Sequence, residues 1–159
     1  MTRMLSRPRF THIALPVNDI PTSVAWYETF TPLRAIDVRR DADGDAAWLA
    51  HPEPADHPFV VVLVSFDATR GTPQRQLGPF GHLGIEMPTP ADVDAVAAAG
   101  RETGCLVWEP SQQPPPVGYV CALADPDGNV VEFSYDQGVY SLFRQRWSDA
   151  DRTGSDPSP

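Results

Sequence analysis

Two histidines and one glutamate are the residues of this chain whose types and spacing could do chemistry. His12 and His82 stand in stretches that share the pattern Phe-x-His-aliphatic-small-aliphatic-x-aliphatic, at an offset of 70 residues. Glu132 stands in a third apolar stretch, VVEFSY. A carboxylate in an apolar strand is costly to bury unless a positive partner meets it. Two imidazoles and one carboxylate form a facial ligand set for a divalent metal, which would be that partner and would keep positions open for substrate or water.

The repeated pattern predicts two modules of the same plan, each opening on a strand that carries one histidine. In the first module we expect a helix from near residue 21 to before residue 32, followed by a hairpin and a final strand. The second module repeats this order and closes on a hairpin whose turn is Asp-Pro-Asp-Gly at residues 125–128. The expected strands cover residues 10–17, 34–40, 46–51 and 59–66, then 82–87, 105–108, 120–124 and 130–135. A second helix is expected over residues 90–101, a proline-stiffened loop over 110–117, and a short terminal helix over 140–147.

These elements predict an α+β fold in which two paired βαβββ modules form a curled mixed sheet around a concave site. The chain has 159 residues, of which 42% are apolar, and this suffices for one domain or for two small modules with a shared core. The expected divisions are a flexible N-terminus (1–9), the first module (10–67), a linker (68–79), the second module (80–137), and a short helix with a disordered tail (138–159). On such strands, side chains two residues apart share a face, so the two imidazoles and the carboxylate can converge.

Composition excludes several classes of partner. The formal net charge is −9 and the pI is about 4.7, whereas nucleic acids and anionic membranes require clustered basic residues. A small neutral or cationic molecule would suit the chain better. No apolar run approaches the roughly 20 residues of a membrane span, and the first ten residues lack the apolar core of a secretion signal, so we expect a cytoplasmic protein. Cys105 and Cys121 are then expected to be reduced.

The chain resembles the vicinal oxygen chelate superfamily, which includes glyoxalase I, extradiol dioxygenases, fosfomycin-resistance enzymes, methylmalonyl-CoA epimerase and bleomycin-binding proteins. The segments that carry the resemblance are THIALPVNDIPTSVAWY, GHLGIEM and DPDGNVVEF, and together they span about residues 10–137. The resemblance implies paired βαβββ modules. It also implies that His12, His82 and Glu132 match three positions at which members bind a divalent metal. A homodimer is expected, because members commonly build the site from paired modules within one chain or across two, and because open sheets leave edges that a partner can cover.

Departures from individual members narrow the choice. Glyoxalase I has a fourth ligand, a carboxylate on the last strand of its first module, where this chain has Val62. Extradiol dioxygenases add a proton-transferring histidine from the second module, but the remaining histidines, His51 and His57, lie in the first. Fosfomycin-resistance enzymes use a basic cluster near the end of the chain, where this sequence has Gln112 and Gln113 and no lysine. Bleomycin-binding members generally lack the metal ligands.

The sequence therefore predicts a metal-dependent small-molecule enzyme of the lyase or isomerase type, acting on a substrate that chelates the metal through oxygen. The metal would be one divalent ion, with Fe, Mn, Ni, Zn and Co all open. Glu132 and Glu86 are the candidate catalytic residues. Glu86 shares the face of His82 but stands four residues further on, about 13 Å along an ideal strand, so it could be a general base at the pocket mouth or a solvated strand end. The alternatives are a ligand-sequestering protein of the bleomycin-binding type and a small extradiol dioxygenase.

Overall fold

The computed structural model describes residues 11–52, 59–78, 80–139, 141–142 and 144–145. The chain forms two compact units. The first runs to Gly81 and also contains the turn Asp125–Asn129, which comes from much later in the chain. The second comprises His82–Ala124 and the residues from Val130 onward. The predicted N-terminal segment 1–9 and tail 148–159 lie outside the described residues. So does part of the predicted helix 140–147, of which residues 141, 142, 144 and 145 are helical.

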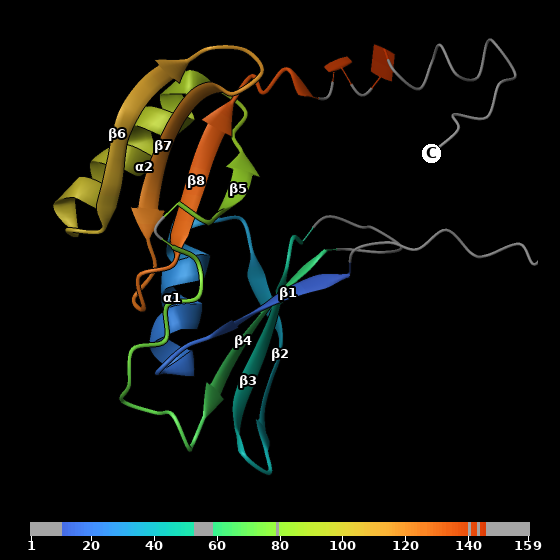
Figure 1. The fold of residues 1–159 in the computed structure, drawn as a ribbon, viewed down its shortest axis with the longest axis vertical. Helices are drawn as coiled ribbons and strands as arrows, with labels where there is room; N and C mark the ends of the chain where they lie inside the picture. Colours follow the sequence, from blue (N-terminus) through green and yellow to red (C-terminus); the bar gives the residue numbers. More distant parts are fainter. Residues whose placement is uncertain (1–10, 53–58, 79, 140, 143, 146–159) are drawn as a thin grey trace, which may run out of the picture. The chain divides into compact units, whose positions relative to one another are not determined.

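The first unit is a four-stranded mixed sheet with one helix (Figure 1). Its elements in chain order are β1 (His12–Pro16), α1 (Ile20–Phe30), β2 (Arg34–Asp41), β3 (Gly44–Ala50) and β4 (Val60–Phe66). The strand order is β1-β4-β3-β2, in which β1 pairs with β4 in parallel and the other pairs are antiparallel. The helix starts where the sequence predicts, because Asp19 accepts a hydrogen bond from the Thr22 amide at 2.9 Å and Pro21 occupies the first turn.

The second unit repeats this plan (Figure 1). Its elements are β5 (His82–Glu86), α2 (Pro90–Glu102), β6 (Leu106–Gln113), β7 (Gly118–Ala124) and β8 (Val130–Tyr135), and the strand order is β5-β8-β7-β6. Again the first strand runs parallel to the last, with antiparallel pairs beyond it. The predicted α+β class and the paired βαβββ modules are confirmed. In the part of the chain that the structure describes, no helix is long and apolar enough to cross a membrane.

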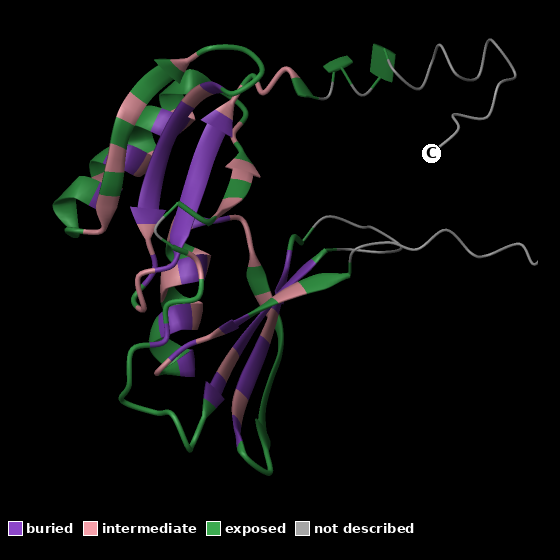
Figure 2. Ribbon diagram, viewed as in Figure 1, coloured by how far each residue is buried: buried purple, intermediate pink, exposed green. Residues whose placement is uncertain are grey.

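Helix α2 covers one face of the second sheet through small side chains. Its buried residues are Val93, Ala97 and Gly100. A β-carbon at Gly100 would come within 2.8 Å of the Leu123 side chain, so glycine lets the helix approach β7 closely. Leu123 and Cys121 are fully buried on this face, while Ala122 between them faces the other way. Figure 2 shows that β7 and β8 are buried along most of their length. The opposite face of these strands is therefore where the predicted site must lie.

Strand β6 is longer than the sequence analysis predicts. The prediction of an unpaired loop over residues 110–117 is wrong for residues 110–113, which belong to β6: Ser111 pairs with Val120 and Gln113 pairs with Gly118. Pro110 lies within a shift of register between Trp108 and Ser111. Proline is tolerated at such a bulge on an edge strand because its missing N–H is not needed by a neighbour. Only residues 114–117 remain as the connection to β7.

A buried tyrosine holds the turn Asp125–Asn129 in the first unit. The Tyr27 side chain is fully buried, and its hydroxyl donates a hydrogen bond to Asp125 Oδ2 at 3.0 Å. Burial raises the pKa of the Asp125 carboxyl, against which hydrogen bonds from Asn129, Tyr27 and the Asp127 amide act in the opposite direction. Two further connections are Asn18 Nδ2 to Asp127 Oδ1 at 2.8 Å and the Gln76 and Leu77 amides to Asn129 Oδ1 at 3.1 and 3.2 Å. The turn motif therefore supplies polar partners to three separate segments.

Replacing Tyr27 with phenylalanine is expected to lower the free energy of unfolding by about 2 kcal/mol, because a buried carboxylate loses a donor. The raised pKa of Asp125 means that the folded state gains stability as pH falls through that pKa toward the ordinary value of 3.8. The hydrogen bond from Tyr27 favours the charged form of the Asp125 carboxyl. The difference in free energy of unfolding between wild type and Tyr27→Phe should therefore become smaller as the pH is lowered. Urea denaturation at several pH values measures this. Tyr119→Phe, which removes a surface hydrogen bond to Asp94, is the matched control, and equal losses for both variants at neutral pH would contradict the prediction.

Candidate functional site

His82 and Glu132, two of the three predicted metal ligands, lie together on the second sheet. His82 opens β5, and Glu132 lies in the middle of β8, which is its parallel neighbour. The register places Gly84 beside Glu132, so the imidazole two residues earlier shares the face of the carboxylate. His82 Nε2 and Glu132 Oε2 are 3.6 Å apart. This separation is too long for a hydrogen bond. It does bring two potential ligand atoms onto one small area.

The surroundings of Glu132 leave room on one side and hold the carboxylate on the other. Its neighbours in the same row of the sheet are Gly84 on β5 and Ala122 on β7. A β-carbon at Gly84 would meet no atom of the described residues within 4 Å, so among these residues the space beside the carboxylate is open there. Gln137 Nε2 donates a hydrogen bond to Glu132 Oε1 at 3.2 Å. One carboxylate oxygen is thus fixed by Gln137, and the other faces His82.

The donor set at this position fits a divalent metal. Glu132 is 7% exposed and lies in an apolar strand, and a carboxylate in such surroundings requires a positive partner or hydrogen bonds. An imidazole nitrogen together with a carboxylate oxygen suits Zn, Fe, Ni, Co or Mn. The amide of Gln137 would orient the carboxylate, as hydrogen-bonding partners of metal ligands commonly do. His82 and Glu132 are therefore suited to supply two ligands.

His12, the third predicted ligand, lies at the start of β1 in the first unit, whereas His82 and Glu132 belong to the second. Its side chain is exposed, and its Nδ1 is 2.8 Å from the Thr11 hydroxyl oxygen. Among the residues that the structure describes, no group of three or more His, Cys, Asp and Glu side chains is arranged to hold a metal. The three-residue ligand set stays a prediction.

Each predicted histidine ligand has a tryptophan beside it, which the sequence analysis did not select. The His82 and Trp108 ring centroids are 5.4 Å apart and the rings are nearly perpendicular, at 82°. The His12 and Trp48 centroids are 6.1 Å apart. Trp48 packs on the buried cluster of Ala50, Val60 and Val62, and its buried indole Nε1 has no hydrogen-bond partner among the residues that the structure describes. A large aromatic side chain therefore lies beside each of the two predicted histidine ligands within its own unit.

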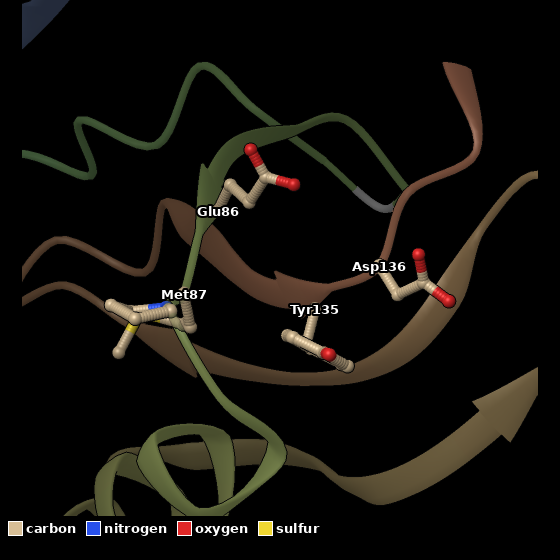
Figure 3. Close-up of a pocket in the computed structure, with 5 residues that line it drawn as sticks. Glu86, Met87, Tyr135 and Asp136 are labelled. Carbon is tan, nitrogen blue, oxygen red and sulfur yellow. The ribbon is translucent and has the colours of Figure 1, made fainter. Parts of the chain in front are cut away.

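Glu86 lies at the far end of β5 and is exposed. It lines a cavity of about 410 Å³ with Met87, Pro88, Tyr135 and Asp136 (Figure 3). Because Glu132 pairs with Gly84, Glu86 is only two residues and one strand away from it, roughly 8 Å between Cα atoms from ideal sheet spacings. Glu86 is therefore nearer to Glu132 than to His82, from which it is about 13 Å away along an ideal strand. Its role as a base stays a prediction.

Other residues that could take part in chemistry are hydrogen-bonded, buried or exposed at other places in the chain. The hydroxyl of Ser65 donates to the Asn18 carbonyl oxygen at 2.9 Å. Burial raises the pKa of the Cys121 thiol to about 11, so this cysteine is neutral at physiological pH and a poor nucleophile. Cys105 and Cys121 are both free thiols. His51 is exposed at the end of β3, and His57 lies outside the described residues.

The arrangement of modules and residues can now be compared with known proteins. The model of the Glyoxalase/Bleomycin resistance protein/Dioxygenase superfamily matches residues 9–133. The chain belongs to this superfamily. An uncharacterized Pseudomonas aeruginosa protein, PA2024, is 38% identical to it over 130 residues, which is 82% of this chain and 90% of the relative. The superfamily includes both enzymes and binding proteins, so membership alone does not assign an activity.

Solved structures share the glyoxalase-like fold of this superfamily member. A glyoxylase/bleomycin resistance protein/dioxygenase domain from Frankia sp. EAN1pec has a TM-score of 0.66 at 19% identity, covering 82% of this chain and 99% of that one. A mutant of the fosfomycin resistance protein FosX from Listeria monocytogenes, solved with Mn(II) and dihydroxypropylphosphonic acid, has a TM-score of 0.59 at 17% identity, covering 82% and 93%. Superfamily members thus include proteins that bind a divalent metal.

One predicted difference from glyoxalase I is visible in this superfamily member. Val62, which stands where the first module would supply a fourth ligand, is a buried residue in the middle of β4 and pairs with Ala14. Strand β4 contains no acidic residue. A four-ligand set with a carboxylate from β4 is therefore absent from this chain.

Proposed function

We propose that this protein binds one divalent metal through His12, His82 and Glu132 and catalyses a lyase or isomerase reaction on a small molecule that chelates through oxygen. The observation that carries the proposal is the pair of His82 and Glu132, with ligand atoms 3.6 Å apart and the carboxylate 7% exposed in an apolar strand. Superfamily membership and the Mn(II)-bound FosX structure support it.

The protein's own groups have separate tasks in this proposal. A bound divalent metal would supply Lewis-acid stabilisation of negative charge that develops on a substrate oxygen. Glu132 would bind through Oε2, since Gln137 already holds Oε1. The missing side chain at Gly84 makes room for the substrate beside this carboxylate. Glu86, at the cavity of Figure 3, would take a proton from the carbon next to the substrate carbonyl and return it to a neighbouring atom.

A lyase or isomerase suits the available groups better than a catechol dioxygenase. A dioxygenase must move protons to and from an oxygenated substrate, for which an imidazole with a pKa near neutrality is well suited. The second module contains no histidine after His82. Glu86 shares the face of Glu132 on the sheet, and a carboxylate in that place is suited to shifting a proton beside a polarised carbonyl.

Metal analysis of protein purified without chelators or a histidine tag tests the proposal. We expect one Fe, Mn, Ni, Zn or Co ion per chain after titration, together with metal-dependent turnover of a hemithioacetal or an α-hydroxycarbonyl compound. Absence of stoichiometric binding would favour a ligand-sequestering protein instead. Metal-dependent O₂ uptake with catechols would contradict the assignment to lyases and isomerases, while leaving the metal site in place.

A further inference from the structure

Trp108 reaches across the second sheet to His82, one of the candidate metal ligands. It lies on β6 and His82 lies on β5, which are the two outermost strands of the sheet. Three strand spacings separate them, or roughly 14 Å between backbones. Their ring centroids are nevertheless only 5.4 Å apart. Both side chains must therefore extend inward over the central strands β7 and β8, and they meet above the row that contains Glu132.

Small residues in that row make the approach possible. The row runs from Gly84 through Glu132 and Ala122 to Trp108, one residue from each strand. Ala122 is fully buried although it carries only a methyl group. It lies directly between Trp108 and Glu132, so it leaves space for an indole to lie beside the carboxylate. A larger residue at position 122 would keep the indole away from His82.

The polar and apolar sides of this site are therefore distinct. Gln137 holds one oxygen of Glu132, and the other oxygen faces His82. Trp108 is the large flat side chain beside this pair, and it is only partly buried. Flat conjugated groups pack on an indole at offset or edge-to-face geometries with a gain beyond the apolar area that they bury. An aliphatic group of similar size lacks that gain.

We propose that Trp108 is a specificity-determining residue that selects oxygen-chelating substrates with a planar, conjugated or aromatic group next to the chelating oxygens. This inference rests on the proposed metal site. The oxygens of the substrate bind on the side of His82 and Glu132, and its planar group packs on the Trp108 indole over Ala122.

Three hydroxamates test this inference on the Co(II)-loaded full-length protein. Acetohydroxamate, cyclohexanecarbohydroxamate and benzohydroxamate share one bidentate oxygen chelator and differ in the attached group. Calorimetry and the visible Co(II) spectrum give their affinities. Wild type should bind benzohydroxamate more tightly than the cyclohexyl compound, although the latter is at least as apolar. In Trp108→Leu the affinity ratio of benzohydroxamate to acetohydroxamate should fall about tenfold, equivalent to about 1.4 kcal/mol, while Trp108→Phe should keep most of it.

The outcomes separate the two proposals. If the hydroxamates bind only with Co(II) present but the cyclohexyl compound matches benzohydroxamate in wild type, the role of Trp108 is wrong and the metal site stands. An unchanged ratio in folded Trp108→Leu leads to the same conclusion. If no hydroxamate binding depends on Co(II), the proposed function fails and this inference fails with it. The wild-type comparison needs no variant, so the test does not depend on whether Trp108→Leu folds.

Discussion

Replacing Glu132 with glutamine is expected to weaken divalent metal binding by more than about 100-fold. Losing a partner that merely orients a metal ligand costs about 10- to 100-fold, and losing the ligand itself should cost more. Gln137→Leu should accordingly weaken metal binding by about 10- to 100-fold, because it removes the hydrogen bond of 3.2 Å from Gln137 to Glu132 Oε1. Glu86→Gln carries the same charge change on an exposed residue and should leave metal affinity unaltered. Isothermal titration with Zn(II) or Mn(II) measures all three.

Stability measurements distinguish loss of a ligand from loss of the fold. Without metal, Glu132→Gln should be at least as stable as wild type, because it removes a buried carboxylate to which, among the described residues, only His82 brings a potential positive charge. Saturating metal should raise the melting temperature of wild type and not of the variant, since a ligand that binds only the native state stabilises it by mass action. Equal metal affinity in wild type and Glu132→Gln would rule out Glu132 as a ligand.

Replacing Gly118 with alanine is expected to lower the free energy of unfolding by about 3 kcal/mol or more. Gly118 opens β7 with a φ of 87°, a conformation that side chains disfavour. Its missing β-carbon would also lie 2.3 Å from the carbonyl oxygen of Tyr135 and 2.8 Å from that of Asp136. Because both contacts are with backbone, no rotation of a side chain can relieve them, and β7 or the end of β8 must move.

Gly104→Ala is the matched control in the same unit. Gly104 has a φ of 74°, but a β-carbon there would meet nothing within 4 Å in the described part of the chain. The free energy of unfolding of Gly104→Ala should fall by only about 1 kcal/mol, which is the cost of a left-handed backbone conformation for alanine. Urea denaturation of both variants therefore separates backbone strain from steric overlap. Similar losses of unfolding free energy in the two variants would mean that the backbone at the end of β8 moves away from a β-carbon at position 118 at little cost.

The fold was predictable because the sequence contains an internal repeat. The matched histidine patterns at residues 12 and 82, each followed by a capped helix, are sufficient to place two βαβββ modules. Strand β6 was predicted too short because Pro110 reads as the end of a strand. That reading holds for a central strand, whereas β6 is an edge strand with a bulge at this position, and such a strand tolerates proline.

The candidate site was predictable only where residue type carries the signal. Glu132 stood out because a carboxylate is unusual in an apolar strand, and its partner His82 followed from the repeat. Gln137 gave no such signal, since an amide just after a strand is ordinary, and its role depends on where the chain turns after β8. Trp108 was missed for a different reason. Its contact with His82 depends on the order of four strands and on the small size of Ala122, neither of which is local to the residue.

The turn Asp125–Asn129 has a consequence for how the protein is made. The first unit contains these five residues, whose partners include Tyr27, Asn18 and the backbone near Gln76. Domains generally fold in order as the ribosome synthesises them, N-terminal part first. Here the first unit cannot be completed when residue 81 is added to the growing chain, because Asp125, the first of its last five residues, is added 44 positions later. Until then the buried hydroxyl of Tyr27 lacks its acceptor, so both modules must be synthesised before either unit reaches its final form.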